Sequence, residues 1–550
     1  MLDFLTTGGS SARIIAAMHS IQRACAALFF LLCCCVIGTA QTEIGGGTLV
    51  VLPFENRSQA PGLDWIGEAF PEVLSQRLGS PNLFSVSRES RDYAFERLGI
   101  PSNTKLSRAT LYRIAEQMDV DEVVVGSYSY DGTIFSARSQ LLNMRTLRLS
   151  AEQVESGPLP KVIEIMTALA WDMQRLSAPA LTTSRNDFIA SWPPIRLDAF
   201  ENYIRGVTAA DKKEKITRLR EAVRLNPNYP QALLQLGKTL YDTRDYQSAA
   251  NTLARVSTAD PASLEANFYL GLAAFYSNDL IRAENAFTYV ASLLPLAEVT
   301  NNRGVTISRR GKRSGLEYFQ RAVKDDPKDP DYHFNLAVAG ARGGNPDDAV
   351  KHLKEAVILQ PSDQEAKALL ETLTASSSSA DQRLPLERIK TNYDENSFRQ
   401  MEWQIRNANE ERMAHADAET QARFHVGRGD QMLNQGFVLE AEKEFRDAIA
   451  HNASLAEAHT GLAQTMEAWS ASAPAASLVE AARTEAQTAI RLKPSAEAYL
   501  VLARLDMREN KPDTASASVS QALALEPKND AALALKKAID LRLGQAQPAE

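Results

Sequence analysis

The spacing of apolar residues after position 229 predicts two consecutive helical hairpins of equal length. Leu233, Leu236 and Leu240 fall on one face of an α-helix, because they recur at the helical period. A second helix shows a matching face made of Ala249, Leu253 and Val256. The whole pattern then repeats, with Gly271 in the place of Gly237 and Phe287 in the place of Leu253. A fixed period of about 34 residues is typical of a helical repeat array.

Small residues and a proline mark the boundaries of each unit. Gly237 and Ala249 allow two helices to approach closely, and Pro261 ends the second helix. Such a hairpin buries its apolar faces only when its neighbours stack on it. The pattern resembles the tetratricopeptide repeat (TPR) family, and the resemblance implies an all-α superhelical solenoid that binds proteins or peptides.

Related spacing divides the rest of the chain into two predicted arrays. Residues 197–374 hold about five repeats, and residues 364–373 are expected to form a capping helix. The serine run Ser376–Ser379 interrupts the pattern, so residues 375–420 are predicted to be a linker that is partly helical and bridges the arrays. Residues 421–545 predict about three further repeats and a cap, with a loop seven residues longer than usual around 470–478.

Residues 45–176 show a different pattern, in which short apolar runs alternate with helical periods. The predicted strands are 48–54, 83–87, 122–126 and a hairpin of 134–142 with 145–152, turning at Asn143-Met144; the predicted helices are 67–78, 111–118 and 162–176. Alternating strands and helices indicate an α/β domain with a mixed sheet. Residues 177–196 are rich in turn formers and are predicted to be a linker of turn and extended character.

The α/β region resembles the TolB amino-terminal-like domain and, more distantly, envelope assembly proteins of the CsgG type. The matching residues are Val51–Asn56, Gly67, Leu74, Leu78, Val123–Ser127 and Gln140-Leu141. The resemblance implies no catalytic residues. The predicted fold class is therefore multidomain, with an α/β domain followed by an all-α TPR solenoid in two arrays.

The first forty residues have the features of a secretory signal peptide. Arg13 and Arg23 precede an apolar run from Ala24 to Ile37, and Gly38-Thr39-Ala40 supplies a small-residue cleavage site. The chain is therefore expected to be exported to the periplasm or cell envelope, starting from Met1 or Met18. The alternative is an amino-terminal membrane anchor that is retained.

Cysteine content and charge exclude several kinds of site. All four cysteines, Cys25, Cys33, Cys34 and Cys35, lie in the signal segment, so the mature chain is expected to form no disulfide and to use no thiol. A formal net charge of −8 without a basic block argues against nucleic acid as a partner. The seven histidines form no metal-binding spacing, and no nucleophile elbow or phosphate loop is present. We therefore predict no catalytic, cofactor or metal site.

The remaining candidate site is the inner face formed by the first helix of each hairpin. The residues expected there are Lys238, Tyr241, Phe268, Phe275, Tyr276, Asn301, Arg309 and Arg342. Arg309 and Arg342 occupy equivalent positions in successive repeats, and arginines beside aromatic residues suit an extended peptide. The alternative places Phe268 and Phe275 in the core and the arginines on a solvated edge. Val305 and Val338 stand where the TPR carboxylate clamp needs polar groups, so this sequence departs from that clamp.

These features predict a non-catalytic, exported protein–protein interaction scaffold of the bacterial cell envelope. Its expected partners are proteins or peptides of an envelope complex, with no nucleic acid and no stable membrane span after signal cleavage. The alternatives are a regulatory or signalling accessory subunit that acts with a separate effector, and an envelope enzyme subunit.

Overall fold

The computed structural model describes residues 47–58, 60–79, 83–101, 106–177, 183–258, 260–294, 296–311, 315–375, 384–391, 393, 395–434, 436, 438–472 and 476–546. The predicted signal peptide and the serine run Ser376–Ser379 lie outside these residues. Within them, no helix combines the length and apolar character needed to cross a membrane.

The amino-terminal region is built around a small mixed sheet, as predicted. Its elements are β1 Gly47–Val51, β2 Glu55–Asn56, α2 Trp65–Leu78, β3 Leu83–Ser85, α3 Arg88–Leu98, α4 Arg108–Met118, β4 Glu122–Tyr130, β5 Ile134–Asn143, β6 Arg148–Leu149, β7 Gln153–Pro158 and α5 Val162–Ser177. The strand order is β3-β1-β4-β5-β6, with β2 paired to β4 and β7 to β5. Strand β1 runs parallel to β3 and β4, whereas β5 is antiparallel to its neighbours.

The predicted hairpin after residue 134 is wrong in detail. Strand β5 forms its long hairpin with β4, and the expected strand at 145–152 is replaced by the short strands β6 and β7. The chain turns over residues 144–147, because the Asn143 side chain accepts hydrogen bonds from Thr146 and Leu147 adopts a left-handed φ of 54°. Helix α3 was not predicted, since it is largely polar and buries only Arg91, Ala94 and Phe95.

The helices that follow stack as hairpins. They are α7 Leu197–Thr208 with α8 Lys212–Leu225, α9 Pro230–Asp242 with α10 Tyr246–Leu253, α11 Ser263–Tyr276 with α12 Leu280–Leu293, α13 Ala297–Arg309 with α14 Leu316–Asp325, and α15 Pro330–Arg342 with α16 Pro346–Leu359, followed by α17 Gln364–Thr374. Glycine is required where the helices of a hairpin meet. A Cβ on Gly237 would lie 2.4 Å from Leu253, and one on Gly271 would lie 2.6 Å from Phe287.

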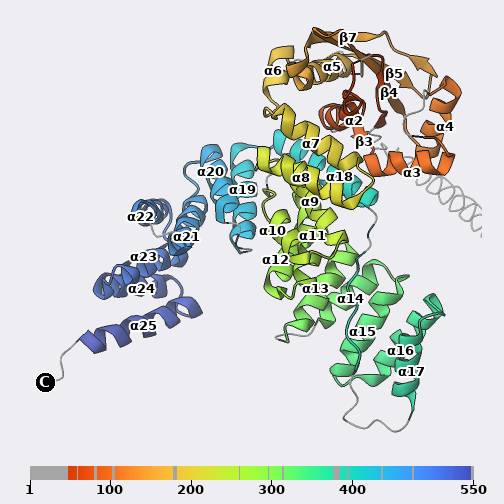
Figure 1. Ribbon diagram of the computed structural model, residues 1–550. Helices are drawn as coiled ribbons and strands as arrows, with labels where there is room; N and C mark the ends of the chain where they lie inside the picture. The colour runs from red at the N-terminus through yellow and green to blue at the C-terminus, as the bar shows by residue number, and fades with distance from the viewer. Residues whose placement is uncertain are drawn as a thin grey trace, which may run out of the picture.

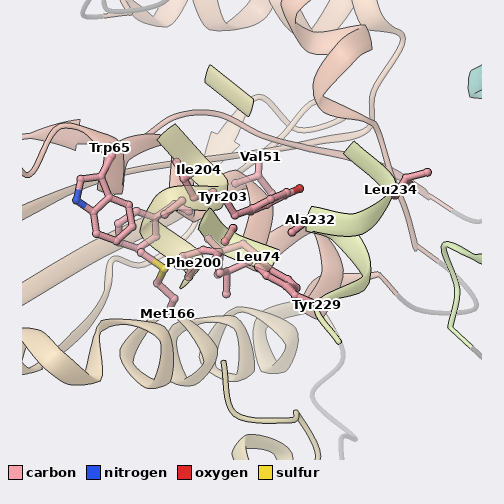
Figure 2. Packing of buried hydrophobic residues seen from close by; sticks show 14 of the residues in the cluster. Val51, Trp65, Leu74, Met166, Phe200, Tyr203, Ile204, Tyr229, Ala232 and Leu234 are labelled. Carbon is pink, nitrogen blue, oxygen red and sulfur yellow. The ribbon is translucent and has the colours of Figure 1, made fainter. Parts of the chain in front are cut away.

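The α/β region and the first hairpin share one hydrophobic core, which Figure 2 shows from close by. The rings of Trp65 in α2 and Phe200 in α7 meet edge to face, with centroids 6.1 Å apart. The Tyr203 hydroxyl donates to Glu72 of α2, and its ring lies 5.1 Å from that of Tyr229. The predicted linker between the α/β region and the first hairpin also departs from the prediction. It contains a short helix, α6 Arg185–Ala190, which Ser184 caps.

Beyond α17 the chain turns back rather than continuing the stack. Residues 384–391 form neither helix nor strand, and α18 spans Glu395–Ala414. The later helices are α19 Ala418–Asn434, α20 Val438–His451, α21 Ala456–Ser472, α22 Ala476–Leu492, α23 Ala496–Arg508, α24 Pro512–Leu525 and α25 Asp530–Ala546. In Figure 1 they extend to one side of α9–α12, while α13–α17 extend to the other.

The long loop expected around residues 470–478 is absent. Helix α21 ends at Ser472 and helix α22 begins at Ala476, and each contains 17 residues. The extra residues therefore lengthen both helices. Longer helices keep these residues in regular hydrogen bonding, which a longer loop would not do.

Candidate functional site

Residues 384–391 of the chain itself lie against the face where a bound peptide was predicted. We call them the docked segment. The surface that holds them, the docking face, consists of residues from α13, α15 and the first turn of α17. It includes three asparagines that are fully buried, namely Asn301, Asn302 and Asn335.

These asparagines bind the main chain of the docked segment. The Asn335 side chain accepts from the Arg388 amide at 2.6 Å and donates to the Arg388 carbonyl at 2.7 Å. The Asn302 side chain accepts from the Lys390 amide at 2.7 Å and donates to the Lys390 carbonyl at 2.8 Å. Asn301 donates to the Arg388 carbonyl at 3.1 Å and accepts from Asn335 at 2.8 Å. Successive repeats therefore hold alternate residues of an extended chain, which runs in the direction opposite to the order of the repeats.

Two arginines bind the acidic residue of the segment, Glu387. Arg309 and Arg342 lie in the last turns of α13 and α15. Arg342 pairs with the Glu387 carboxylate and donates to the Pro385 carbonyl at 2.7 Å, while Arg309 donates to the Glu387 carbonyl at 2.9 Å. The Glu387 side chain is only 1% exposed. Burial lowers the pKa of Arg309, and the negative charge of Glu387 opposes that shift.

Carboxylates bind the two basic residues of the segment. Arg388 pairs with Asp331, Asp363 and Glu365, and its guanidinium lies 3.6 Å from the centre of the Phe334 ring. Lys390 lies 2.7 Å from Asp329 and 2.9 Å from Asp331. The hydrogen bond from Arg388 lowers the pKa of Asp363.

Those four carboxylates all lie at helix starts, Asp329 and Asp331 at α15 and Asp363 and Glu365 at α17. Acidic residues there also complement the helix dipole. None of the four was predicted as a site residue. Their spacing along the chain is explained by helix capping alone, and nothing in it indicates a partner.

The structure divides the predicted site residues into three groups. Asn301, Arg309 and Arg342 contact the docked segment, as described above. Lys238 lies elsewhere, pairing with Glu265 at 2.7 Å and with Glu395 of α18 at 3.0 Å. Tyr241 and Tyr276 form an aromatic cluster with Tyr246, whose ring stacks on that of Tyr276 at 4.9 Å.

The two phenylalanines differ in burial. Phe268 is a core residue, which agrees with the alternative prediction that it does not face a peptide. It packs against Phe287 and Tyr393. Phe275 is partly buried, and the Arg309 guanidinium lies 5.8 Å from the centre of its ring.

Three side-chain pairs that involve four histidines join the two helices of a hairpin, and none of these pairs was predicted from the sequence. His333 lies 3.1 Å from His352, His425 lies 2.8 Å from Glu444, and His459 lies 2.6 Å from Glu485. The partners are 19, 19 and 26 residues apart, so the pairs are visible only once the hairpin register is known. Across the described residues, no three potential ligands among histidine, cysteine, aspartate and glutamate are grouped to hold a metal ion.

A cavity of about 1000 Å³ lies between the α/β region, the first hairpins and α18. Its lining mixes carboxylates, including Glu72 and Glu402, with bases, including Arg88 and Arg399. Burial raises the pKa of Glu402 to about 7. Because opposite charges are interspersed around it, the cavity does not select for a ligand of either sign.

Comparison with known structures gives partial matches of low identity. MamA from Desulfovibrio magneticus RS-1 is 23% identical, with 31% of this chain and 99% of that chain covered and a TM-score of 0.29. YrrB, described as a TPR protein with an unusual peptide-binding site, is 16% identical, with 32% and 92% covered and a TM-score of 0.29. The carboxy-terminal domain of LpoB from Salmonella enterica is 19% identical, with 22% and 87% covered and a TM-score of 0.18.

The family assignment rests on the sequence of the repeats. No curated protein matched the chain. Residues 234–295 and 308–379 match the family described as Tetratricopeptide repeat. These ranges include most of α9 and all of α10–α12 and α14–α17. Helix α13 falls between them except for its last two residues, so Asn301 and Asn302 lie outside the match. The chain therefore carries tetratricopeptide repeats in these two ranges. The docked segment contacts α15 and α17 within the second range and α13 between the two.

Proposed function

We propose that this chain is a non-catalytic interaction scaffold that binds an extended segment of a partner protein on the docking face. The observation that supports this proposal is the pairing of Asn302 and Asn335 with main-chain amides and carbonyls. Every extended peptide offers the same groups, so the docking face can hold a segment from another protein in the same way.

We further propose that the scaffold works in the cell envelope after export. The basic residues, apolar run and small residues of positions 13–40 support this location. The α/β region, with its TolB-like sequence features, would dock on one envelope component. Residues 421–545 would form a second TPR array with its own protein-binding surface. Amino-terminal sequencing of the chain from fractionated cells tests export, and we expect the mature chain to begin at Gln41.

Site-specific photo-crosslinking tests the binding of a partner on the docking face. A photoreactive phenylalanine analogue would replace Phe275 in the full-length chain, because Phe275 lies beside Arg309. We expect one partner to be crosslinked in cells and to be lost when Arg309→Glu and Arg342→Glu are added. These changes repel an acidic residue at the position that Glu387 occupies.

The matched control reverses two exposed arginines on outer helices, Arg220→Glu and Arg321→Glu. Crosslinking should be unchanged in this control. A partner captured equally well by the Arg309 and Arg342 double variant would contradict the proposed site.

A further inference from the structure

We infer that the docked segment is a displaceable stand-in for the partner, whose own segment carries an acidic residue, arginine, an apolar residue and lysine in that order. This order is that of Glu387, Arg388, Ile389 and Lys390. The inference rests on the proposed function, because it names the chemistry of the peptide that enters the same face.

The docking face separates charge along its two edges. Arg309 and Arg342 lie at the ends of α13 and α15, whereas the four carboxylates lie at the starts of α15 and α17. Successive side chains of an extended chain point in opposite directions. Glu387 therefore meets the basic edge, and Arg388 and Lys390, two residues apart, both meet the acidic edge.

The position between the two basic residues selects an apolar side chain. Ile389 is partly buried and packs against the cluster formed by Val305, Phe319, Leu336 and Ala339. A charged side chain there would lose hydration without gaining an ionic partner from this cluster. The four consecutive positions thus impose four separate requirements, which together define a sequence pattern and a direction of binding.

The face is built so that it can open. Apart from the ring of Phe334, polar and charged side chains supply its contacts to Glu387, Arg388 and Lys390, and water can satisfy these groups when the segment leaves. Among the apolar side chains of the segment, Leu386 is exposed, whereas Leu384 and Ile389 pack on buried clusters. Departure of the segment therefore uncovers apolar surface under two side chains only. The region just beyond the segment is different, because Tyr393 and Phe398 pack on Phe268. Replacement of the docked segment by a partner peptide therefore involves residues 384–391 only, while α18 stays packed on α11.

Tethering explains why a partner would need more than one favourable contact. A segment held within the same chain competes at an effective concentration on the order of 1 mM. A free peptide of the same sequence must exceed that concentration to displace it. A partner that carries the pattern and also contacts another surface of the protein meets this requirement.

The test uses full-length protein and a fluorescent peptide with the sequence of residues 384–391. In the variant Arg388→Glu with Lys390→Glu, the docked segment carries glutamates opposite Asp329, Asp331 and Asp363, so it should leave the face. We expect this variant to bind the peptide at least ~10-fold more tightly than the unmodified protein, measured by fluorescence anisotropy. The control Lys351→Glu with Lys354→Glu makes the same charge change on the exposed side of α16 and should bind like the unmodified protein.

Peptide variants separate this inference from the proposed function. A peptide with the charges at positions 387 and 388 exchanged should bind at least ~10-fold more weakly, since each charge then faces its own sign. Equal binding of both peptides would overturn the sequence pattern but leave a peptide-binding face in place. Absence of binding by any peptide, with unchanged helicity and melting temperature, would overturn both.

Hydrogen exchange on the unmodified protein gives a second measurement that does not depend on a variant. Peptide at several millimolar should speed exchange of the Arg388 and Lys390 amides, which Asn335 and Asn302 protect. Unchanged exchange of both amides at saturating peptide would show that the segment is a permanent part of the fold.

Discussion

At the scale of single residues, the turn inside six of the described hairpins contains one left-handed position. Its φ is 63° at Arg244, 63° at Asn278, 66° at Gly311, 80° at Gly344, 85° at Gly436 and 57° at Asn510. Glycine and asparagine tolerate this conformation, whereas an arginine pays a steric cost there. Asp245 and Asp279 follow directly and cap the next helix by accepting from Ser248 and Arg282.

Replacing Arg244 by glycine should therefore stabilise the protein by roughly 1 kcal/mol, because it removes the clash of the Cβ atom. Arg244 is exposed, so little packing is lost. The measurement is the urea midpoint of unfolding, with Arg244→Ala as the control that keeps the Cβ atom. Equal midpoints for the glycine and alanine variants would contradict the explanation.

Residue spacing identified part of the docking face and missed the rest for a physical reason. Arg309 and Arg342 stood out because they recur at equivalent positions of adjacent repeats. Asn335 did not stand out, since its partner Arg388 is 53 residues away and belongs to a segment with no helical period. A contact between a helix and an extended segment so distant in the chain has no local signature.

At the scale of elements, α18 is the unusual helix, because it contacts both the repeats and the α/β region. Phe398 packs on Phe268 of α11, and Arg399 pairs with Glu265 of the same helix. Trp403 meets Phe84 of β3, with ring centroids 5.7 Å apart. The helix was predicted in part, but its neighbours were not, since a polar helix with scattered aromatic residues shows no single apolar face.

Helix α18 should dock less well as pH rises, because it buries Glu402. Burial raises the pKa of this carboxyl from 4.5 to about 7, so the neutral form is favoured in the folded protein. The resulting stabilisation is complete below about pH 4.5 and is lost as pH rises through 7. Glu402→Gln should remove this loss and raise the melting temperature above pH 7.

The measurement is thermal unfolding of both proteins across that range of pH. The two melting curves should converge at the acidic end, where Glu402 is protonated in the folded and unfolded states. A difference that is independent of pH would show that packing, rather than ionisation, is responsible. Glu480→Gln, at an exposed position on α22, serves as the control.

At the scale of the whole molecule, two hydrophobic clusters unite parts that are separate in sequence. One runs from the sheet into α7 and α9, and the other joins α11 and α12 to α18 and the helices from α19 to α23. Local patterns predicted the sheet and the repeats, because each forms from its own periodicity. They did not predict the return of the chain, which depends on contacts such as the pair between Arg399 and Glu89, 310 residues apart.

Contact between α18 and the α/β region should depend on Trp403. Trp403→Ala removes the edge-to-face contact with Phe84, worth about 1 kcal/mol. We expect faster hydrogen exchange in the carboxy-terminal half of α18, with exchange in α5 unchanged. Trp171→Ala is the control, because Trp171 lies on α5, far from α18 in Figure 1. Unchanged exchange in α18 would show that other contacts hold it.

The return of the chain after α17 also determines how the molecule would carry tension. A pull on its two ends would pass from the α/β region through α11 into α18, because noncovalent contacts connect these elements directly. Helices α13–α17 form a side branch and would bear no load until α18 came away. The docked segment would then peel off from its Lys390 end, one residue at a time. The chain can therefore lengthen through this branch only after both α18 and the docked segment have detached.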